Sequence, residues 1–127
     1  MTHALTIDLA HIDRAVIRLT LERLGVSVTE TTSPDDAIGR VRLDEPEIVF
    51  VDTSLSVLGG GELVSTLREA CAQTRIVAIT SFADGDVRAR LRHAGAAAVL
   101  ERPLTPARVR YAAALAAPVP QHHAAAA

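Results

Sequence analysis

The stretch Ile48-Val49-Phe50-Val51-Asp52 is a continuous apolar run of strand length that ends at an aspartate. Such a run is typical of a central strand in a parallel sheet, because that strand is buried on both faces. Before it, Val26-Ser27-Val28-Thr29 alternates between apolar and polar residues, which indicates an edge strand with one buried face. After it, Arg75-Ile76-Val77-Ala78-Ile79 repeats the buried pattern. These three stretches predict a parallel sheet with residues 48–52 near its centre.

Helical patterns separate the predicted strands along the chain. Weaker strand-length runs lie at residues 5–7 and 97–100, and helices are predicted to begin near residues 12, 34, 62, 84 and 105. Five strands alternating with five helices predict an α/β fold of the (βα)5 type, with helices on both faces of the sheet. The residues after the first strand, Asp8-Leu9-Ala10-His11, lack the glycines of a dinucleotide-binding fingerprint. We therefore expect the flavodoxin-like strand order 2-1-3-4-5, which places the alternating strand at an edge.

The length and composition favour one globular domain. We expect residues 1–117 of the 127 to form this domain, and the Pro/Ala-rich residues 118–127 to form a disordered tail or the start of a linker. The net charge of −2 argues against direct nucleic-acid binding. All 13 basic residues are arginines, which excludes Schiff-base chemistry and a phosphate-loop lysine. A single cysteine, no apolar run of bilayer-spanning length and no N-terminal signal pattern predict a cytoplasmic protein without membrane contact.

Polar side chains end the predicted strands at one edge of the sheet. Asp8 follows the first strand, Asp52 the third, Thr80 the fourth, and Arg102 comes just after the fifth. Ligands bind at this edge, at the switch point between strands 1 and 3, where Asp8 and Asp52 should lie close together. Two carboxylates in an open cleft suit Mg²⁺, and a nearby hydroxyl and cation can hold the oxygens of a tetrahedral anion. The residues therefore predict metal-assisted transfer of a phosphoryl group to a carboxylate.

Five short motifs occur along the chain at the spacing that is found in a known family. They are Asp8, Asp52, Thr80 at the end of Val77-Ala78-Ile79-Thr80, the tripeptide Ala94-Gly95-Ala96, and the turn Arg102-Pro103-Leu104. On these motifs, residues 4–117 resemble a response-regulator receiver domain of two-component signalling. The resemblance implies that Asp52 receives a phosphoryl group from a histidine kinase or phosphotransfer protein, with Thr80 and Arg102 beside it. It also implies Mg²⁺ held by Asp8, Asp52 and the backbone carbonyl of Ser54.

Several residues depart from the family pattern near the predicted site. Leu9 stands where the family has a second acid that binds the metal, and leucine cannot coordinate a cation. Asp13 lies inside a predicted helix and is not expected to replace that acid. Arg102 stands where the family has lysine; it keeps the charge and can bind a phosphoryl group through two donors. We therefore expect weak Mg²⁺ binding, and the alternative is a pseudo-receiver that binds partners without phosphorylation.

Each candidate residue also has a purely structural interpretation. Asp8 and Asp52 can be turn or helix-capping acids, and Thr80 can satisfy backbone groups at its strand end. Arg102 can form an ion pair with Asp52 or Asp8. A flavin or nucleotide carrier on the same fold is disfavoured by the 2% aromatic content and the missing phosphate loop. We expect no enzymatic activity beyond phosphorylation and dephosphorylation of Asp52 itself.

Arginines in the C-terminal part suggest a partner surface. Arg88 and Arg92 lie one turn apart on the fourth predicted helix, and Arg108 and Tyr111 lie on the last one. The resemblance to receiver domains implies that the face of helix 4, strand 5 and helix 5 docks a second copy of the chain or an effector. The alternative is a solvated helix face, because no residue here specifies a particular partner.

Overall fold

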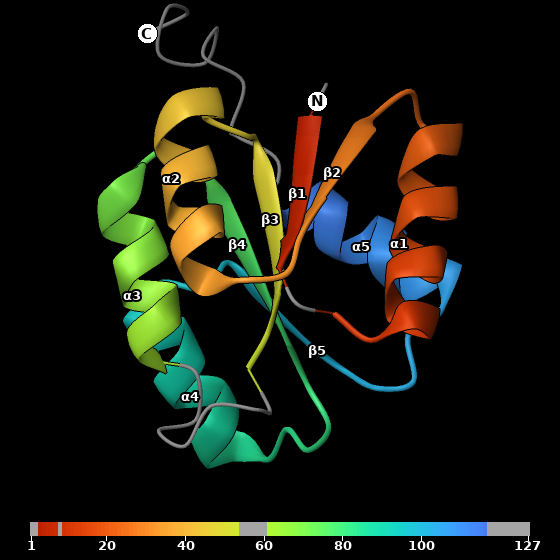
Figure 1. Ribbon diagram of the computed structural model, residues 1–127. Helices are drawn as coiled ribbons and strands as arrows, with labels where there is room; N and C mark the ends of the chain where they lie inside the picture. Colours follow the sequence, from red (N-terminus) through yellow and green to blue (C-terminus); the bar gives the residue numbers. More distant parts are fainter. Residues whose placement is uncertain (1–2, 8, 54–60, 117–127) are drawn as a thin grey trace, which may run out of the picture.

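One parallel sheet forms the middle layer of the protein (Figure 1). The computed structural model describes residues 3–7, 9–53 and 61–116. Within them, five strands pair in the order β2-β1-β3-β4-β5, and every pairing is parallel. The strands are β1 His3–Ile7, β2 Ser27–Thr31, β3 Ile48–Asp52, β4 Arg75–Thr80 and β5 Ala98–Glu101. The strand order confirms the predicted flavodoxin-like fold, with β2 at an edge and β3 at the centre.

Five helices cover the two faces of the sheet (Figure 1). They are α1 His11–Arg23, α2 Pro34–Asp44, α3 Gly61–Ala70, α4 Gly85–Ala94 and α5 Pro106–Ala116. Helices α1 and α5 pack on one face, and α2, α3 and α4 pack on the other. None of the described helices is both long and apolar enough to cross a membrane. Residues 118–127, the predicted tail, lie outside the described residues.

The central strand β3 sends its side chains alternately into two apolar cores. Ile48 and Phe50 belong to the core beneath α1 and α5, whereas Val49 and Val51 belong to the core beneath α2, α3 and α4. All four side chains are fully buried. Burying a side chain of this size stabilises a fold by about 1.5–3 kcal/mol. Burial on both sides explains why the sequence of β3 is continuously apolar until Asp52.

Hydroxyl caps and glycines set the helix boundaries that the sequence predicted. Oγ of Ser33 accepts a hydrogen bond from the backbone N–H of Asp36 at 3.0 Å, which caps α2. Gly95 ends α4 with a φ of +124°, a conformation that L side chains rarely adopt. A Cβ on Gly95 would also lie 3.2 Å from Cγ of Arg68. These local signals set where α2 begins and where α4 ends.

Candidate functional site

The carboxyl ends of β3, β4 and β5 bring three predicted site residues to one edge of the sheet. Asp52 is the last residue of β3, and Thr80 is the last residue of β4. Arg102 follows Glu101, where β5 ends. Because the strands are parallel, these residues meet at the same edge, where ligands of doubly wound sheets bind.

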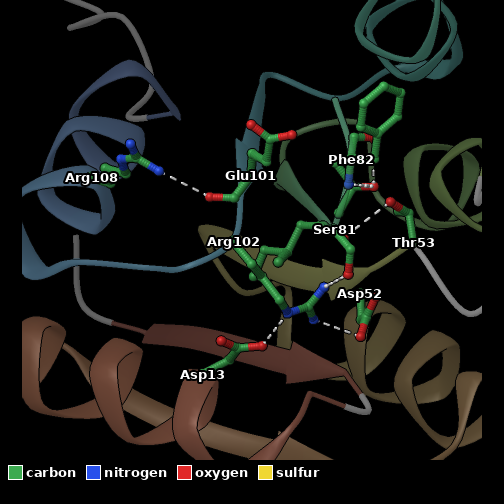
Figure 2. A network of polar contacts seen from close by, with 10 residues as sticks. Asp13, Asp52, Thr53, Ser81, Phe82, Glu101, Arg102 and Arg108 are labelled. Atoms are coloured by element: carbon green, nitrogen blue, oxygen red, sulfur yellow. Dashed lines mark hydrogen bonds and ion pairs between the residues drawn. The ribbon is translucent and has the colours of Figure 1, made fainter. Parts of the chain in front are cut away.

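Arg102 is the centre of a polar network at this edge (Figure 2). Its Nη2 donates to Oδ2 of Asp52 at 2.7 Å, and its Nε donates to Oδ2 of Asp13 at 2.6 Å. Its Nη1 donates to Oγ of Ser81 at 3.3 Å. The side chains of Asp13 and Asp52 are only 5% and 6% exposed, and that of Arg102 is 20% exposed. The ion pair with Asp52 that the sequence left open is therefore present, and Arg102 binds a second carboxylate as well.

Asp13 joins the site, although its position inside a predicted helix argued against a role there. It lies in the first turn of α1, and 89 positions separate it from Arg102. Helices α1 and α5 pack together on one face of the sheet, so the start of α1 approaches the turn between β5 and α5 (Figure 1). The available sequence signal was an acid in a first helical turn, which also stabilises a helix by itself. Asp13 is therefore a site residue that reasoning from the sequence missed.

The charges of this network favour the ionised form of Arg102. Partial burial by itself would lower the pKa of Arg102, because it penalises the charged form. The hydrogen bonds and charges of Asp13 and Asp52 outweigh burial and raise the pKa of Arg102 above its ordinary value. The guanidinium is thus a permanent cation between two nearly buried carboxylates, and hydrogen bonds between such charged groups are among the strongest in proteins.

The hydroxyl of Thr80 is engaged in the turn that follows β4. Its Oγ1 donates to the carbonyl of Phe82 at 3.1 Å and accepts from the N–H of Phe82 at 3.3 Å. Thr80 is 6% exposed, whereas Phe82 is 65% exposed. This arrangement matches the structural interpretation of Thr80 as a hydroxyl that satisfies the backbone at its strand end. A role in sensing a phosphoryl group stays a prediction.

The turn between β4 and α4 is tied to β5 by two further charged side chains. The N–H of Ala83 donates to Oε2 of Glu101 at 2.9 Å. Arg88 donates from Nε to the carbonyl of Ala83 and from Nη1 to the carbonyl of Val99, both at 3.1 Å. The sequence offered no sign that Glu101 would hold this turn. These contacts fix the start of α4 against β5.

Of the four residues predicted to bind a partner on α4 and α5, Arg88 does not have an exposed guanidinium. Arg88 is half-buried and binds backbone carbonyls, so its guanidinium is not part of an exposed docking face. Arg92, Arg108 and Tyr111 are exposed, as expected. Arg108 also donates from Nη1 to the carbonyls of Glu101 at 3.1 Å and Pro103 at 3.4 Å. The exposed part of this face consists of α4 and α5 side chains without Arg88.

The described residues do not present a donor set for Mg²⁺. Leu9 is 6% exposed and packs in the apolar core beneath α1 and α5. The carboxylate of Asp52 is bound by the cation of Arg102. Among residues 3–7, 9–53 and 61–116, no group of three or more His, Cys, Asp or Glu side chains could hold a metal ion. Asp8 and Ser54, the other two predicted ligands, lie outside the described residues, so their roles stay predictions.

A cavity of about 380 Å³ lies beside the charged network. It is lined by Ile12, Asp13, Val16, Arg102, Pro103 and Leu104. The cavity therefore joins the start of α1 to the turn after β5, and both Asp13 and Arg102 contribute to its wall.

A parallel sheet of this order defines a doubly wound α/β domain, and the charged network at its carboxyl edge is the candidate ligand site. A family comparison is more specific: the model described as "Response regulator receiver domain" matches residues 4–114. The chain belongs to the response regulator receiver domain family. The resemblance drawn from the sequence motifs is thus confirmed, and with it the assignment to two-component signalling.

The chain is similar to a curated response regulator over part of that protein's length. Response regulator UvrY of Escherichia coli strain K12 is 29% identical over 111 residues, which cover 86% of this chain and 51% of UvrY. The chain therefore spans about half the length of this relative. The solution structure of a response regulator protein from Burkholderia multivorans is also similar, with 28% sequence identity and a TM-score of 0.73. This similarity covers 94% of the present chain and 98% of the Burkholderia chain.

More distant solved structures share the fold. Chemotaxis response regulator CheY4 of Vibrio cholerae has a TM-score of 0.79 at 19% identity, covering 91% of this chain and 98% of that one. A response regulator from Burkholderia pseudomallei, with a phosphorylated aspartic acid, a calcium ion and citrate, has a TM-score of 0.76 at 23% identity. That similarity covers 88% of this chain and 66% of the Burkholderia chain.

Proposed function

We propose that this receiver domain accepts a phosphoryl group on Asp52 and thereby switches the binding of a partner. The proposed donor is the phosphohistidine of a histidine kinase or of a phosphotransfer protein. The observation that carries the proposal is the 2.7 Å contact between Nη2 of Arg102 and Oδ2 of Asp52 at the carboxyl edge of β3. It places a permanent cation where a phosphoryl group on Asp52 would carry its negative charge.

The proposed step is a direct phosphoryl transfer between two side chains. An oxygen of the Asp52 carboxylate attacks the phosphorus, the bond from phosphorus to the donor nitrogen breaks, and Asp52 becomes an acyl phosphate. The guanidinium of Arg102 stabilises charge on the phosphoryl oxygens during the step. The domain is a signalling module, and we expect no catalysis of other substrates.

Mg²⁺ is proposed only as a weakly held ion. The predicted ligands are Asp8, Asp52 and the backbone carbonyl of Ser54, and when bound the ion would supply positive charge to phosphoryl oxygens. Leu9 offers no oxygen, and Arg102 already binds the Asp52 carboxylate. These two residues weaken a site for a divalent cation, so no step of the transfer is derived through it.

The proposed switch lies in the turn after β4. Thr80 now binds the backbone of Phe82, and Glu101 binds the N–H of Ala83. If Thr80 turned its hydroxyl to a phosphoryl group on Asp52, its two contacts with Phe82 would be lost. The turn and the start of α4 would then change position. A partner that binds the exposed side of α4 and α5, including Arg92, Arg108 and Tyr111, would detect this change.

Other properties expected from the sequence stay proposals. We place the domain in residues 1–117, treat residues 118–127 as a tail or linker, and expect the protein in the cytoplasm. The partners are proposed to be the phosphoryl donor and an effector or a second copy of the chain. No direct contact with nucleic acid or membrane is proposed for this domain.

Chemical phosphorylation tests the proposed function. The domain is incubated with acetyl phosphate in excess Mg²⁺, and its intact mass and amide NMR spectrum are recorded. We expect the mass of one phosphoryl group to be added and the amide signals around Asp52 to shift. The matched control is Asp52→Asn, which keeps the size of the side chain and removes the nucleophile. Unchanged mass and spectrum of the natural protein would contradict the proposal.

The pseudo-receiver is the second candidate function, and one observation favours it. Leu9 is packed in the apolar core, so the acid that the family uses for metal binding is replaced by a core residue. On this hypothesis the fold binds partners without phosphorylation. Leu9→Asp distinguishes the two candidates by Mg²⁺ titration. A large gain in Mg²⁺ affinity would support the pseudo-receiver, whereas tight binding already present in the natural protein would exclude it.

A further inference from the structure

The favourable interaction of an acid with the first turn of a helix does not account for the buried ion pair between Asp13 and Arg102. The side chain of Asp13 is only 5% exposed, and its Oδ2 lies 2.6 Å from Nε of Arg102. An ionised carboxylate buried to this extent is stable only beside a strong partner. Arg102 supplies that partner, so the position of each residue depends on the other. A surface position in the first turn of α1 would have given the same helix charge at no burial cost.

The contact with Asp13 also orients the guanidinium of Arg102. A guanidinium is planar and holds its donors in a fixed fork, unlike the single ammonium nitrogen of lysine. With Nε on Asp13, the two Nη groups are directed to Ser81 and Asp52 (Figure 2). The fork is therefore aimed at the edge where the phosphoryl group would be bound. It needs no rearrangement to reach Asp52.

We propose that Arg102, held in place by Asp13, is the counter-cation for phosphoryl transfer at Asp52, so that the transfer proceeds without a divalent metal. The inference rests on the proposed function of Asp52 as the phosphoryl acceptor. Asp13 is a positioning residue in this site, because it acts through Arg102. Two features of the chain support this: Leu9 offers no oxygen to a metal ion, and the contact with Asp13 holds the guanidinium of Arg102 2.7 Å from Oδ2 of Asp52.

The reaction with a small phosphoryl donor is balanced without a metal. An oxygen of Asp52 attacks the phosphorus of acetyl phosphate, and the bond between phosphorus and the acetate oxygen breaks. Acetate leaves with the bonding electron pair, and no proton or redox change is required. Arg102 stabilises the charge on the transferred oxygens throughout, as preorganised cations do in phosphoryl transfer.

The primary experiment compares rates of Asp52 phosphorylation by acetyl phosphate in Mg²⁺ and in excess chelator. For the natural protein we expect comparable rates under both conditions. For Asp13→Asn, we expect the rate in chelator to fall by at least about tenfold, because the guanidinium loses a charged anchor, and Mg²⁺ to restore part of it. Asp13→Glu should recover part of the rate in chelator. The matched control is Glu22→Gln, which removes an exposed α1 carboxylate paired with Arg18.

A second variant keeps the test decisive if Asp13→Asn folds poorly. Arg102→Lys retains the charge but lacks the Nε that binds Asp13, so its phosphorylation should become dependent on Mg²⁺. A binding measurement that does not depend on turnover accompanies both variants. In Mg²⁺ titrations followed by amide NMR, Arg102→Gln should bind Mg²⁺ at least about tenfold more tightly than the natural protein, because the repelling charge is gone.

The outcomes separate this inference from the proposed function. Phosphorylation of the natural protein in Mg²⁺ but not in chelator would overturn the inference and leave the proposed function standing. Equal loss of rate by Asp13→Asn in both conditions would also overturn it, because Asp13 would then have only a structural role. No phosphorylation under either condition would overturn both.

Discussion

Among the residues that the structure describes, Arg18 on the surface and Arg102 close to the core each bind two carboxylates. Arg18 on α1 contacts Glu22 and Glu30 at 3.2 Å, and these three side chains are 37%, 48% and 31% exposed. Ion pairs of this kind are screened by water and contribute about 0–1 kcal/mol to stability. The surface network therefore adds little to the fold, although it too joins one arginine to two carboxylates.

The network of Arg102 is more buried than that of Arg18, and removing one of its partners should lower the stability of the fold more. Its contacts with Asp13 and Asp52 measure 2.6 and 2.7 Å, and both carboxylates are nearly buried. Removing one partner of a buried pair leaves a charge that water cannot solvate well. The comparison teaches that burial, and not the count of ion pairs, decides which arginine matters for stability and for chemistry.

The largest effect in this comparison is expected from Arg102→Met. The substitution keeps most of the apolar stem but removes the cation from two nearly buried carboxylates. We expect the free energy of unfolding to fall by about 3–5 kcal/mol, as for other broken buried pairs. Urea denaturation at neutral pH measures it. A loss no larger than that of Arg18→Met would contradict the assignment of Arg102 to a buried network.

A smaller effect is expected from Asp13→Asn. Arg102 keeps its contact with Asp52, so only one charge-assisted hydrogen bond is weakened. We expect a loss of about 1.5–3 kcal/mol in the free energy of unfolding. The same urea experiment on Glu22→Gln is the control on the same helix. If the two variants lose equal stability, the contrast between the buried and the exposed network is wrong.

The smallest effect is expected from Arg18→Gln, and salt should remove it. We expect a loss of about 1 kcal/mol or less at low ionic strength. At about 1 M salt the Debye length is near 3 Å, so the exposed pairs of Arg18 should contribute almost nothing. Thermal unfolding of the variant and the natural protein at both salt concentrations checks this. Salt sensitivity of Arg102→Met as strong as that of Arg18→Gln would contradict the comparison.

Most of the fold could be predicted from the sequence because its signals are local. The apolar run of β3, the cap at Ser33 and the left-handed glycine at Gly95 each depend on a few neighbouring residues. The strand order was inferred from the missing dinucleotide-binding glycines after the first strand and from the alternating pattern of the second strand, rather than from particular contacts. Observed strand ends differ by one or two residues from the prediction, because backbone pairing continues past the apolar run. β1, for example, begins at His3, which pairs with Ser27.

The sequence predicted only those site residues that lie at or just after the ends of strands. Asp52 and Arg102 were selected because parallel strands end at one edge, and they do meet there. Arg88 was interpreted as an exposed helix residue, but its long side chain reaches carbonyl groups of the neighbouring turn and strand. Helical spacing gives the direction of a side chain at its base and does not give the reach of its guanidinium.

The sequence by itself determined the layered sheet, the order of its strands and the edge at which charged residues gather, because hydrophobic periodicity and chain connectivity are properties of the chain alone. Only the tertiary structure decided that Asp13 shares Arg102 with Asp52. That contact spans 89 positions and depends on the angle at which α1 packs beside the turn after β5. A difference of a few ångströms in this packing separates a buried ion pair from a solvated one, and no local pattern encodes such a distance.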